Sequence, residues 1–307
     1  MRIALGESLA DYGGKNSELV VLDADVSGST KSFMFKDKYP ERFFNVGIAE
    51  PSLVNTAAGL AMEGKIPFIN AFAGILSYRA LEQIRTSVAY NDTNVKIAAG
   101  YAGVSDYKDG STHHSLFDIA IMRAMPNMTV IVASDGPQVK ALVPKITEYP
   151  GPVYLRVSRA DVPDHFNINE EDIEIGKART IKEGHDVTLI TTGIALHRCL
   201  EAAKLLESKG ISTRLIEIHT IKPLDKEKII ESANKTDAII TVEEHNIIGG
   251  LYGAVSETLV GKTNKPVIPI GVEDEYMPTS LNPEELWDYC GLSPKNIVKQ
   301  AQKGLNE

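Results

Sequence analysis

The chain has 307 residues, enough for two domains, and its 43% hydrophobic and 24% charged residues are typical of a soluble globular protein. Its net charge of -9 disfavours a nucleic-acid partner, and no apolar run is long enough to cross a membrane or resembles a signal peptide. The two cysteines, Cys199 and Cys290, form no paired motif, so we expect free thiols in a reducing cytoplasm.

Short apolar runs alternate with helical patterns through the first half of the chain. Each run is rich in β-branched residues and is bounded by glycine, proline or polar residues, which is typical of a strand. Alternating strands and helices predict a mostly parallel sheet covered by helices. The expected strands are Glu18–Asp25, Phe43–Ala49, Ile66–Phe72, Val95–Ala102, Met128–Asp135 and Pro152–Ser158, and the expected helices include Pro51–Met62, Ile75–Ala89 and Pro137–Ile146.

The pattern changes near Pro163. Residues 164–179 are acidic and polar with little periodicity, which indicates a linker. A second alternating set follows, so we predict an α/β protein of two doubly wound domains, residues 1–163 and 180–307. The expected elements of the second domain are strands Asp186–Thr192, Ser212–Ile218, Asp237–Glu244 and Lys265–Val272, and helices Ile194–Lys209, Asp225–Ala233 and Gly250–Val260.

Polar and aromatic residues follow the expected strands of the first domain. In doubly wound sheets, ligands bind at the carboxyl ends of the strands, so residues there are expected to meet. The candidates in these positions are Asp25 to Ser29, Glu50, Phe72, Tyr101 to His113, and Arg159.

The tract from Asn45 to Pro51 places Glu50 at the start of a helix, with proline in the first turn. A carboxylate is favoured there by the helix dipole alone. The neighbouring Val46 and Ile48 are expected to exclude water, and desolvation raises a carboxyl pKa. The sequence therefore leaves open a second use, in which Glu50 shares a proton with a heterocyclic nitrogen.

Phe72, Ile75 and Tyr78 recur every three residues and share a stripe if a helix begins near Ala73. Such a stripe is common in a core. It also suits a flat cradle for an aromatic ring.

Asp109 and His113 lie in a glycine-containing loop after the fourth expected strand. They are four residues apart, within reach of one substrate, and histidine serves as acid or base near neutrality. A surface turn at Asp109-Gly110 is the alternative. Zinc is not expected, because no third ligand tract has suitable spacing. Arg2 and Arg159 could bind phosphate through their guanidinium forks or form surface ion pairs.

Together these tracts resemble the pyrimidine-binding domain of transketolase, a thiamine-diphosphate enzyme. The second half resembles the transketolase C-terminal domain, through Thr241–His245 and Gly249-Gly250, so the resemblance covers nearly the whole chain. The most specific matches are Val46–Glu50, Asp109–His113 and Ser158-Arg159.

The resemblance implies a role for each matching residue. Glu50 is similar to the glutamate that shares a proton with N1′ of the aminopyrimidine, which favours the imino form that deprotonates the thiazolium. The cofactor then acts as nucleophile and electron sink. By position, the pyrimidine would be surrounded by Phe72, Ile75 and Tyr78, and Asp25 would lie near the cofactor. The donor hydroxyls would be contacted by Asp109 and His113. The sugar phosphate would be held by Arg2, Ser29, Tyr101 and Arg159.

Three positions depart from the family pattern. Ile75 stands where many transketolases have a stacking phenylalanine, and Tyr101 stands where many have a phosphate-binding histidine. Ala49 precedes the glutamate where arginine is frequent, and the Gly-Ile-Ala-Glu form is also similar to deoxyxylulose-phosphate synthase.

The chain lacks the Gly-Asp-Gly tract and following Asn with which thiamine enzymes bind the magnesium diphosphate. The resemblance therefore implies a split enzyme, in which a separate N-terminal subunit supplies the diphosphate and Mg²⁺ site and no metal ligand lies on this chain. The cofactor would then lie between subunits. We expect two copies of each chain, joined through a large apolar interface.

The favoured activity is transfer of a two-carbon ketol unit between sugar phosphates, with the individual sugars left open. The alternatives are a subunit similar to deoxyxylulose-phosphate synthase, a subunit similar to the beta chain of 2-oxo acid dehydrogenases, and a non-catalytic scaffold that kept the fold. The second domain, including His245, is expected to be mainly structural.

Overall fold

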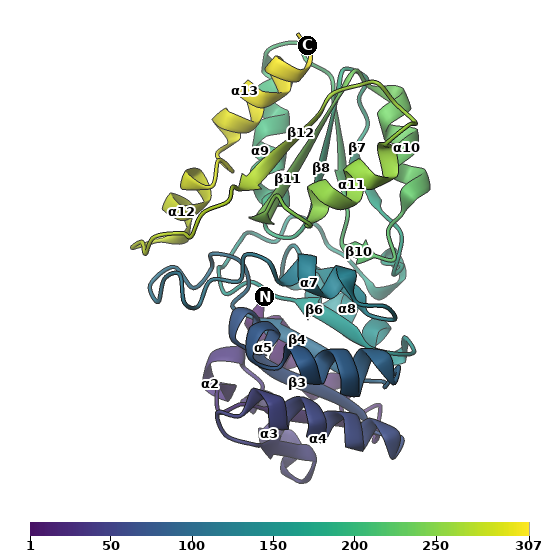
Figure 1. Cartoon of the computed structure of the whole chain (residues 1–307), viewed down its shortest axis with the longest axis vertical. Helices are drawn as coiled ribbons and strands as arrows, with labels where there is room; N and C mark the ends of the chain where they lie inside the picture. Colours follow the sequence, from purple (N-terminus) through teal and green to yellow (C-terminus); the bar gives the residue numbers. More distant parts are fainter. Residues whose placement is uncertain (307) are drawn as a thin grey trace.

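Two β-sheets, each covered by helices, make up the computed structural model, which describes residues 1–306 (Figure 1). Both sheets are mainly parallel, which confirms the predicted α/β class. The first has the strand order β10-β5-β6-β4-β3-β1-β2 and the second β12-β11-β8-β9-β7. The strands of the first sheet are β1 (Leu19–Asp23), β2 (Phe43–Asn45), β3 (Ile66–Phe72), β4 (Lys96–Gly100), β5 (Thr129–Val132), β6 (Val153–Arg156) and β10 (Thr220–Lys222). Those of the second are β7 (Arg179–Lys182), β8 (Val187–Thr191), β9 (Thr213–Glu217), β11 (Ala238–Asn246) and β12 (Val267–Val272).

The strand β1 shows why the first sheet is buried on both faces. Side chains alternate along a strand, so Leu19 and Val21 enter one apolar cluster while Val20 and Leu22 enter another. The first cluster includes residues of helices α1 (Arg2–Tyr12), α3 (Phe33–Lys38) and α8 (Gly136–Glu148). The second includes residues of α4 (Glu50–Met62), α5 (Ala73–Arg79) and α7 (Asp118–Ala124).

The helix expected over Ile75–Ala89 is broken. The structure has α5, then α6 (Leu81–Gln83), then a π-helical stretch over Ile84–Tyr90. The break lies at Ala80, whose φ of -111° and ψ of 20° leave the α region. The prediction of one continuous helix was wrong, because the apolar spacing alone does not show a local change of backbone angle.

The second half of the chain adds a strand to the first sheet. The three-residue strand β10 pairs antiparallel with β5, and the Lys222 ammonium group donates to the carbonyls of Arg123 and Met125. Ile190 and Ile216, from the second sheet, also join an apolar cluster of the first. The two sheets therefore share a core and are not joined by a linker alone.

The segment expected to be a linker packs against the first domain. It contains a short 3₁₀ helix (Glu170–Asp172), and the side chains of Ile168 and Ile173 on either side of it are buried in the apolar cluster that includes α8. The boundaries between the predicted domains stay a prediction, because this segment and β10 both contact the first sheet.

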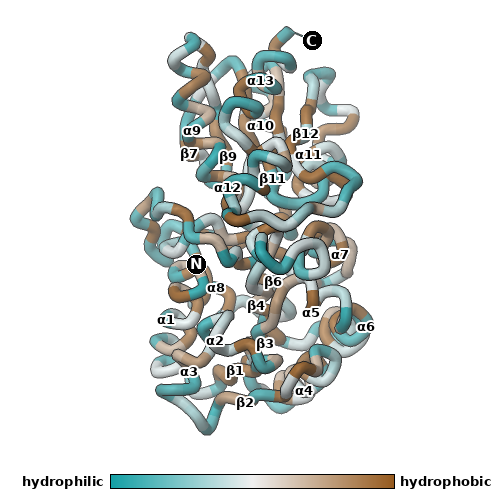
Figure 2. Tube along the Cα trace, turned by 90° about the vertical axis from the view of Figure 1, so that its left-hand side faces the viewer, coloured by the Kyte–Doolittle hydropathy of each residue, from teal (hydrophilic) through white to brown (hydrophobic). Residues whose placement is uncertain are grey.

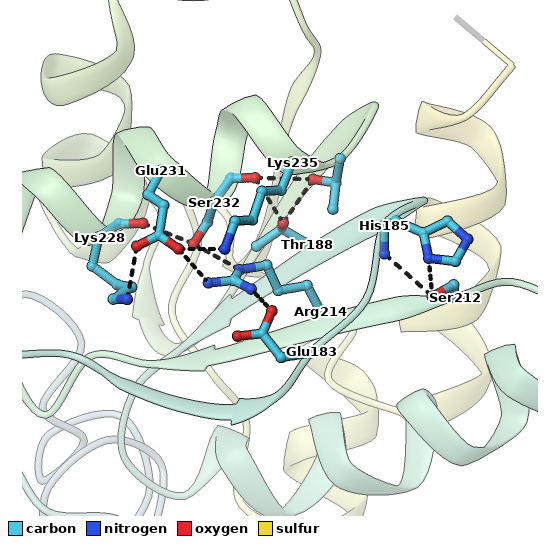
Figure 3. Close-up of polar contacts among 10 residues, drawn as sticks. Glu183, His185, Thr188, Ser212, Arg214, Lys228, Glu231, Ser232 and Lys235 are labelled. Carbon is cyan, nitrogen blue, oxygen red and sulfur yellow. Dashed lines mark hydrogen bonds and ion pairs between the residues drawn. The ribbon is translucent and has the colours of Figure 1, made fainter.

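Hydrophobic and hydrophilic residues alternate along helix α9 (Ala195–Ser208), as expected for an amphipathic helix (Figure 2). Arg214 on β9 is fully buried and donates to the Ser232 hydroxyl over 3.0 Å and to Glu231 over 3.3 Å, and it also pairs with Glu183 (Figure 3). The contacts with Ser232 and Glu231 fix β9 to α10 (Lys226–Lys235). None of the helices in residues 1–306 is long and apolar enough to cross a membrane. The helices of this domain are α9 (Ala195–Ser208), α10 (Lys226–Lys235), α11 (Leu251–Leu259), α12 (Pro283–Tyr289) and α13 (Pro294–Gly304).

Candidate active site

The residues singled out in the first half of the sequence lie at one edge of the first sheet. Strands β6, β4, β3, β1 and β2 are neighbours in that order, and the carboxyl ends of parallel strands meet at the same edge. Each of these strands leads into one candidate residue. They are Arg159 after β6, Tyr101 after β4, Phe72 at the end of β3, Asp25 after β1 and Glu50 after β2.

Tyr101 is the centre of one group. Its φ of 58° lies in the left-handed region, which is uncommon outside glycine and costs about 1–3 kcal/mol. The Arg2 guanidinium donates to the Tyr101 hydroxyl over 2.9 Å and to the Ser29 carbonyl over 2.8 Å. Both Arg2 and Arg159 place Cζ 5.1 Å from the centroid of the tyrosine ring, and the Phe72 ring lies 4.3 Å from it. Two cations and one hydroxyl thus gather where an anion could bind.

Asp106 belongs to the same group, although in the sequence it was included only as part of the range Tyr101 to His113 and was not singled out. Its Oδ1 accepts a hydrogen bond of 2.6 Å from Nη1 of Arg159, and its side chain is fully buried. Burial first, and then the neighbouring Asp109 carboxylate, raise the pKa of Asp106 to about 6, while Arg159 opposes the shift. The only signal was the position of Asp106 three residues before Asp109.

The loop that carries Asp109 and His113 is closed by a backbone bridge. The Ser115 amide donates to the Gly103 carbonyl over 2.9 Å. Asp109 is exposed, whereas His113 is half-buried and places its ring centroid 6.4 Å from that of Phe72. The structure therefore brings His113 next to the group around Tyr101.

The second domain also contacts the loop that carries Asp109 and His113. The Ser111 hydroxyl donates to the Met277 carbonyl over 2.6 Å, and the Ser280 amide donates to the Tyr107 carbonyl over 2.9 Å. Both contacts join the loop to the segment that precedes α12. The position of the loop thus depends on both halves of the chain.

Glu50 begins α4 and is 5% exposed. Its Oε1 lies 3.4 Å from Nη1 of Arg79, at the end of α5. Ile48 was expected to shield the carboxylate, but this side chain is 74% exposed and points to solvent, so that part of the interpretation was wrong. The buried carboxylate and its arginine form a second polar group at the edge of the sheet.

Phe72, at the end of β3, and Tyr78, in α5, have different aromatic neighbours. Tyr78 stacks on Phe117, with centroids 4.6 Å apart and rings inclined by 22°, whereas Phe72 contacts Tyr101. Burial, followed by the nearby Asp118 carboxylate, raises the pKa of Tyr78 to about 12. Phe117 was not selected from the sequence. Phe72 and Tyr78 frame the two ends of α5, and the half-buried Ile75 lies between them in the sequence.

Asp25 follows β1 and lies beside the end of β2. It is exposed, has a φ of 64°, and accepts a hydrogen bond of 2.8 Å from the side chain of Asn45. This bond ties the loop after β1 to the tract that leads into Glu50.

Comparison with known proteins identifies the family of the chain. Residues 1–164 match the model of the transketolase pyrimidine binding domain, and residues 176–297 match that of the transketolase C-terminal domain. The chain belongs to the transketolase family. The resemblance inferred from the sequence is thus confirmed, and the fold is that of the C-terminal half of transketolase.

The chain is similar over nearly its whole length to transketolase sections and subunits of about its own size. The chain is 44% identical to a putative transketolase C-terminal section of Methanocaldococcus jannaschii, over 100% of this chain and 96% of the relative. It is 38% identical to a 6-deoxy-6-sulfo-D-fructose transketolase subunit of Clostridium sp., over 96% and 91%. A solved structure described as a split gene transketolase, inactive beta4 tetramer, has 44% identity and a TM-score of 0.91, with 99% of this chain and 98% of that chain covered.

The transketolase family generally uses thiamine diphosphate, and the residues at the sheet edge fit its aminopyrimidine. A buried carboxylate such as Glu50 can bind a ring nitrogen, and Phe72, Ile75 and Tyr78 offer apolar surface for the ring faces. Within residues 1–306 no group of three or more His, Cys, Asp or Glu side chains could hold a metal ion. These residues at the sheet edge therefore suit the pyrimidine end of the cofactor.

Proposed function

We propose that the chain is the C-terminal subunit of a two-chain transketolase that transfers a two-carbon ketol unit from a ketose phosphate to an aldose phosphate. One observation carries the proposal: the buried Glu50 carboxylate lies at the same edge of the sheet as the guanidinium groups of Arg2 and Arg159, which contact the Tyr101 ring. One group suits the cofactor and the other suits the anionic end of a sugar. The Clostridium relative, named for a sulfonated ketose, supports a donor with a terminal anion.

Thiamine diphosphate, when bound, supplies a nucleophilic carbon and an electron sink. Glu50 would hold a proton at the pyrimidine nitrogen, and the start of α4 would keep its carboxyl in place. Phe72 and Tyr78 would orient the ring. His113 and Asp109 would bind the donor hydroxyls, and His113 would move a proton at the reacting oxygen.

Arg2 and Arg159 would hold the terminal anion through charge-assisted hydrogen bonds, with the Tyr101 hydroxyl beside them. The Ser29 carbonyl would keep Arg2 in place. Asp25 would line the cofactor side of the edge.

The proposal includes a partner subunit that binds the diphosphate and Mg²⁺. The similar structure that consists of beta chains is described as inactive, which supports the need for such a partner. We expect two copies of each chain in the active assembly. Both cysteines are buried and free, which agrees with the proposed cytoplasmic location.

The deciding experiment measures ketol transfer from xylulose 5-phosphate to ribose 5-phosphate with thiamine diphosphate and Mg²⁺. The chain is assayed alone and mixed with a transketolase N-terminal subunit that carries the Gly-Asp-Gly tract. Activity in the mixture only is the expected result. An inactive mixture in which assembly and cofactor binding are demonstrated would overturn these substrates and direct the search to other ketoses or to 2-oxo acids.

A further inference from the structure

The guanidinium group of Arg159 is held on three sides. Its Nη1 donates to Oδ1 of Asp106 over 2.6 Å, and its Cζ lies 5.1 Å from the ring centroid of Tyr101 and 5.3 Å from that of Tyr107. The backbone amide of Arg159 also donates to the Ser105 hydroxyl over 3.0 Å. The Arg159 side chain keeps 25% of its surface exposed to solvent. A ligand would therefore meet an arginine whose geometry is already fixed.

Asp106 acts on Arg159 from inside the protein. Its side chain has no exposed surface, so water cannot screen its charge from the guanidinium as it does at a surface pair. The Asp106 carbonyl also accepts the amides of Asp109 and Gly110, at 3.2 and 3.3 Å. One residue thus fixes both the turn that presents Asp109 and the cation at the anion end of the site.

The charges around Tyr101 set what this end can bind. Arg2 and Arg159 contribute two positive charges, and the buried Asp106 contributes a negative charge in direct contact with one of them. A bound dianion would place its second charge near the Asp106 carboxylate, and because this buried charge is screened less than a surface charge, the repulsion would weaken binding of the dianion. A singly charged group avoids most of this cost.

We propose that Asp106 is a specificity-determining residue for the terminal group of the donor. It positions Arg159 between two tyrosine rings and offsets the positive charge of the guanidinium. A doubly charged terminal group therefore binds with little more affinity than a singly charged one. This inference rests on the proposed function, because it takes the group around Tyr101 as the site of the donor's terminal anion. The chemical class of the donor is then a ketose that ends in a phosphate or a sulfonate.

The test compares two polyols that lack a carbonyl and cannot react, xylitol 5-phosphate and the matching xylitol 5-sulfonate. Calorimetric titration of the assembled enzyme at pH 8, where the phosphate is a dianion, gives Kd for each. Asp106→Asn keeps the oxygen that accepts from Arg159 and removes the charge. We expect this variant to bind the phosphate about 10-fold more tightly and the sulfonate only about 3-fold more tightly, which widens the preference for phosphate.

Asp161→Asn is the matched control, because it removes an exposed carboxylate two residues after Arg159 and should leave both Kd values unchanged. Asp106→Ser serves as a second uncharged variant if Asp106→Asn does not assemble, with the same widening expected. If the Asp106 variant changes Kd by the same factor for both polyols, the role of Asp106 is overturned while the proposed function still stands. If the wild-type enzyme binds its cofactor but neither polyol, the anion site and the proposed function both fail.

Discussion

The Arg79 guanidinium reaches a carboxylate that is almost withdrawn from solvent: its Nη1 lies 3.4 Å from Oε1 of Glu50. The Arg79 side chain is 55% exposed and the Glu50 side chain 7%, so the ion pair joins a surface group to a buried one. Glu50 starts α4 and Arg79 ends α5, and the contact therefore joins α4 to the helix that carries Ile75 and Tyr78.

Glu50→Gln should reduce kcat of the assembled enzyme by about 100-fold or more, because the amide cannot share a proton with a ring nitrogen. The two side chains have nearly the same size, so the assembly should keep its stoichiometry. Turnover in the ketol-transfer assay, together with sedimentation of the complex, checks both statements. Glu63→Gln, at the exposed far end of α4, is the control and should keep full activity. Near-normal turnover of the Glu50 variant would remove Glu50 from the mechanism.

His113→Ala should lower kcat/KM for the ketose donor by about 100-fold, since a group that moves a proton in the transition state contributes roughly this factor. The side chain is half-buried on a loop, so the melting temperature should change little. The control is His185→Ala, because His185 has an 80% exposed side chain in the second domain. An unchanged kcat/KM in the His113 variant would place His113 outside the site.

Much of the sheet edge could be predicted because it depends on local pattern. Continuous apolar runs identified β1 and β3, and the rule that sites follow parallel strands placed Phe72 and Arg159 at one edge. The short strand β10 could not be predicted, because three residues carry no measurable periodicity and their pairing with β5 comes from tertiary packing.

The contacts within the site were harder to predict than its members. Asp106 and Arg159 are 53 residues apart, and Arg79 and Glu50 are 29 apart, so no local spacing connects them. The expected shielding by Ile48 failed for a related reason, since hydrophobicity predicts burial only when another element covers the side chain.

Gly103→Ala should destabilise the protein by about 2–5 kcal/mol. Gly103 has a φ of 66°, and an added Cβ would lie 2.1 Å from Oε2 of Glu244. Glu244 cannot easily move, because its Oε1 accepts a 2.7 Å hydrogen bond from Trp287 and its Oε2 lies 3.8 Å from Nη1 of Arg156. Left-handed strain adds about 1–2 kcal/mol to an overpacking cost of about 1–3 kcal/mol. Urea unfolding measures the loss.

The matched control is Gly210→Ala, where φ is 76° and no atom lies within 4 Å of the added Cβ. Only the backbone strain should contribute at this position, so the free energy of unfolding should fall by about 1–2 kcal/mol. Equal losses at the two positions would mean that the contact with Glu244 relaxes freely and that the junction between the two sheets is not rigid.

His219 should make the protein less stable in mild acid. It lies between β9 and β10 and is fully buried; burial first, and then the Arg179 charge, lower its pKa to about 4. The unfolded chain takes up a proton near pH 6.5, whereas the folded protein resists protonation until about pH 4. Stability is therefore lost as the pH falls through this window, by about 1.4 kcal/mol per pH unit at most.

His219→Gln removes this proton linkage, so the comparison is made between its stability and that of the wild type at pH 7.5 and pH 5.0. From the higher to the lower pH, the free energy of unfolding of the wild type should fall relative to that of the variant by about 2 kcal/mol. His185→Gln, which removes an exposed imidazole, should follow the wild-type profile at both pH values. Parallel profiles for wild type and His219→Gln would show that the folded protein accommodates a protonated His219, and the junction around β10 would then admit water.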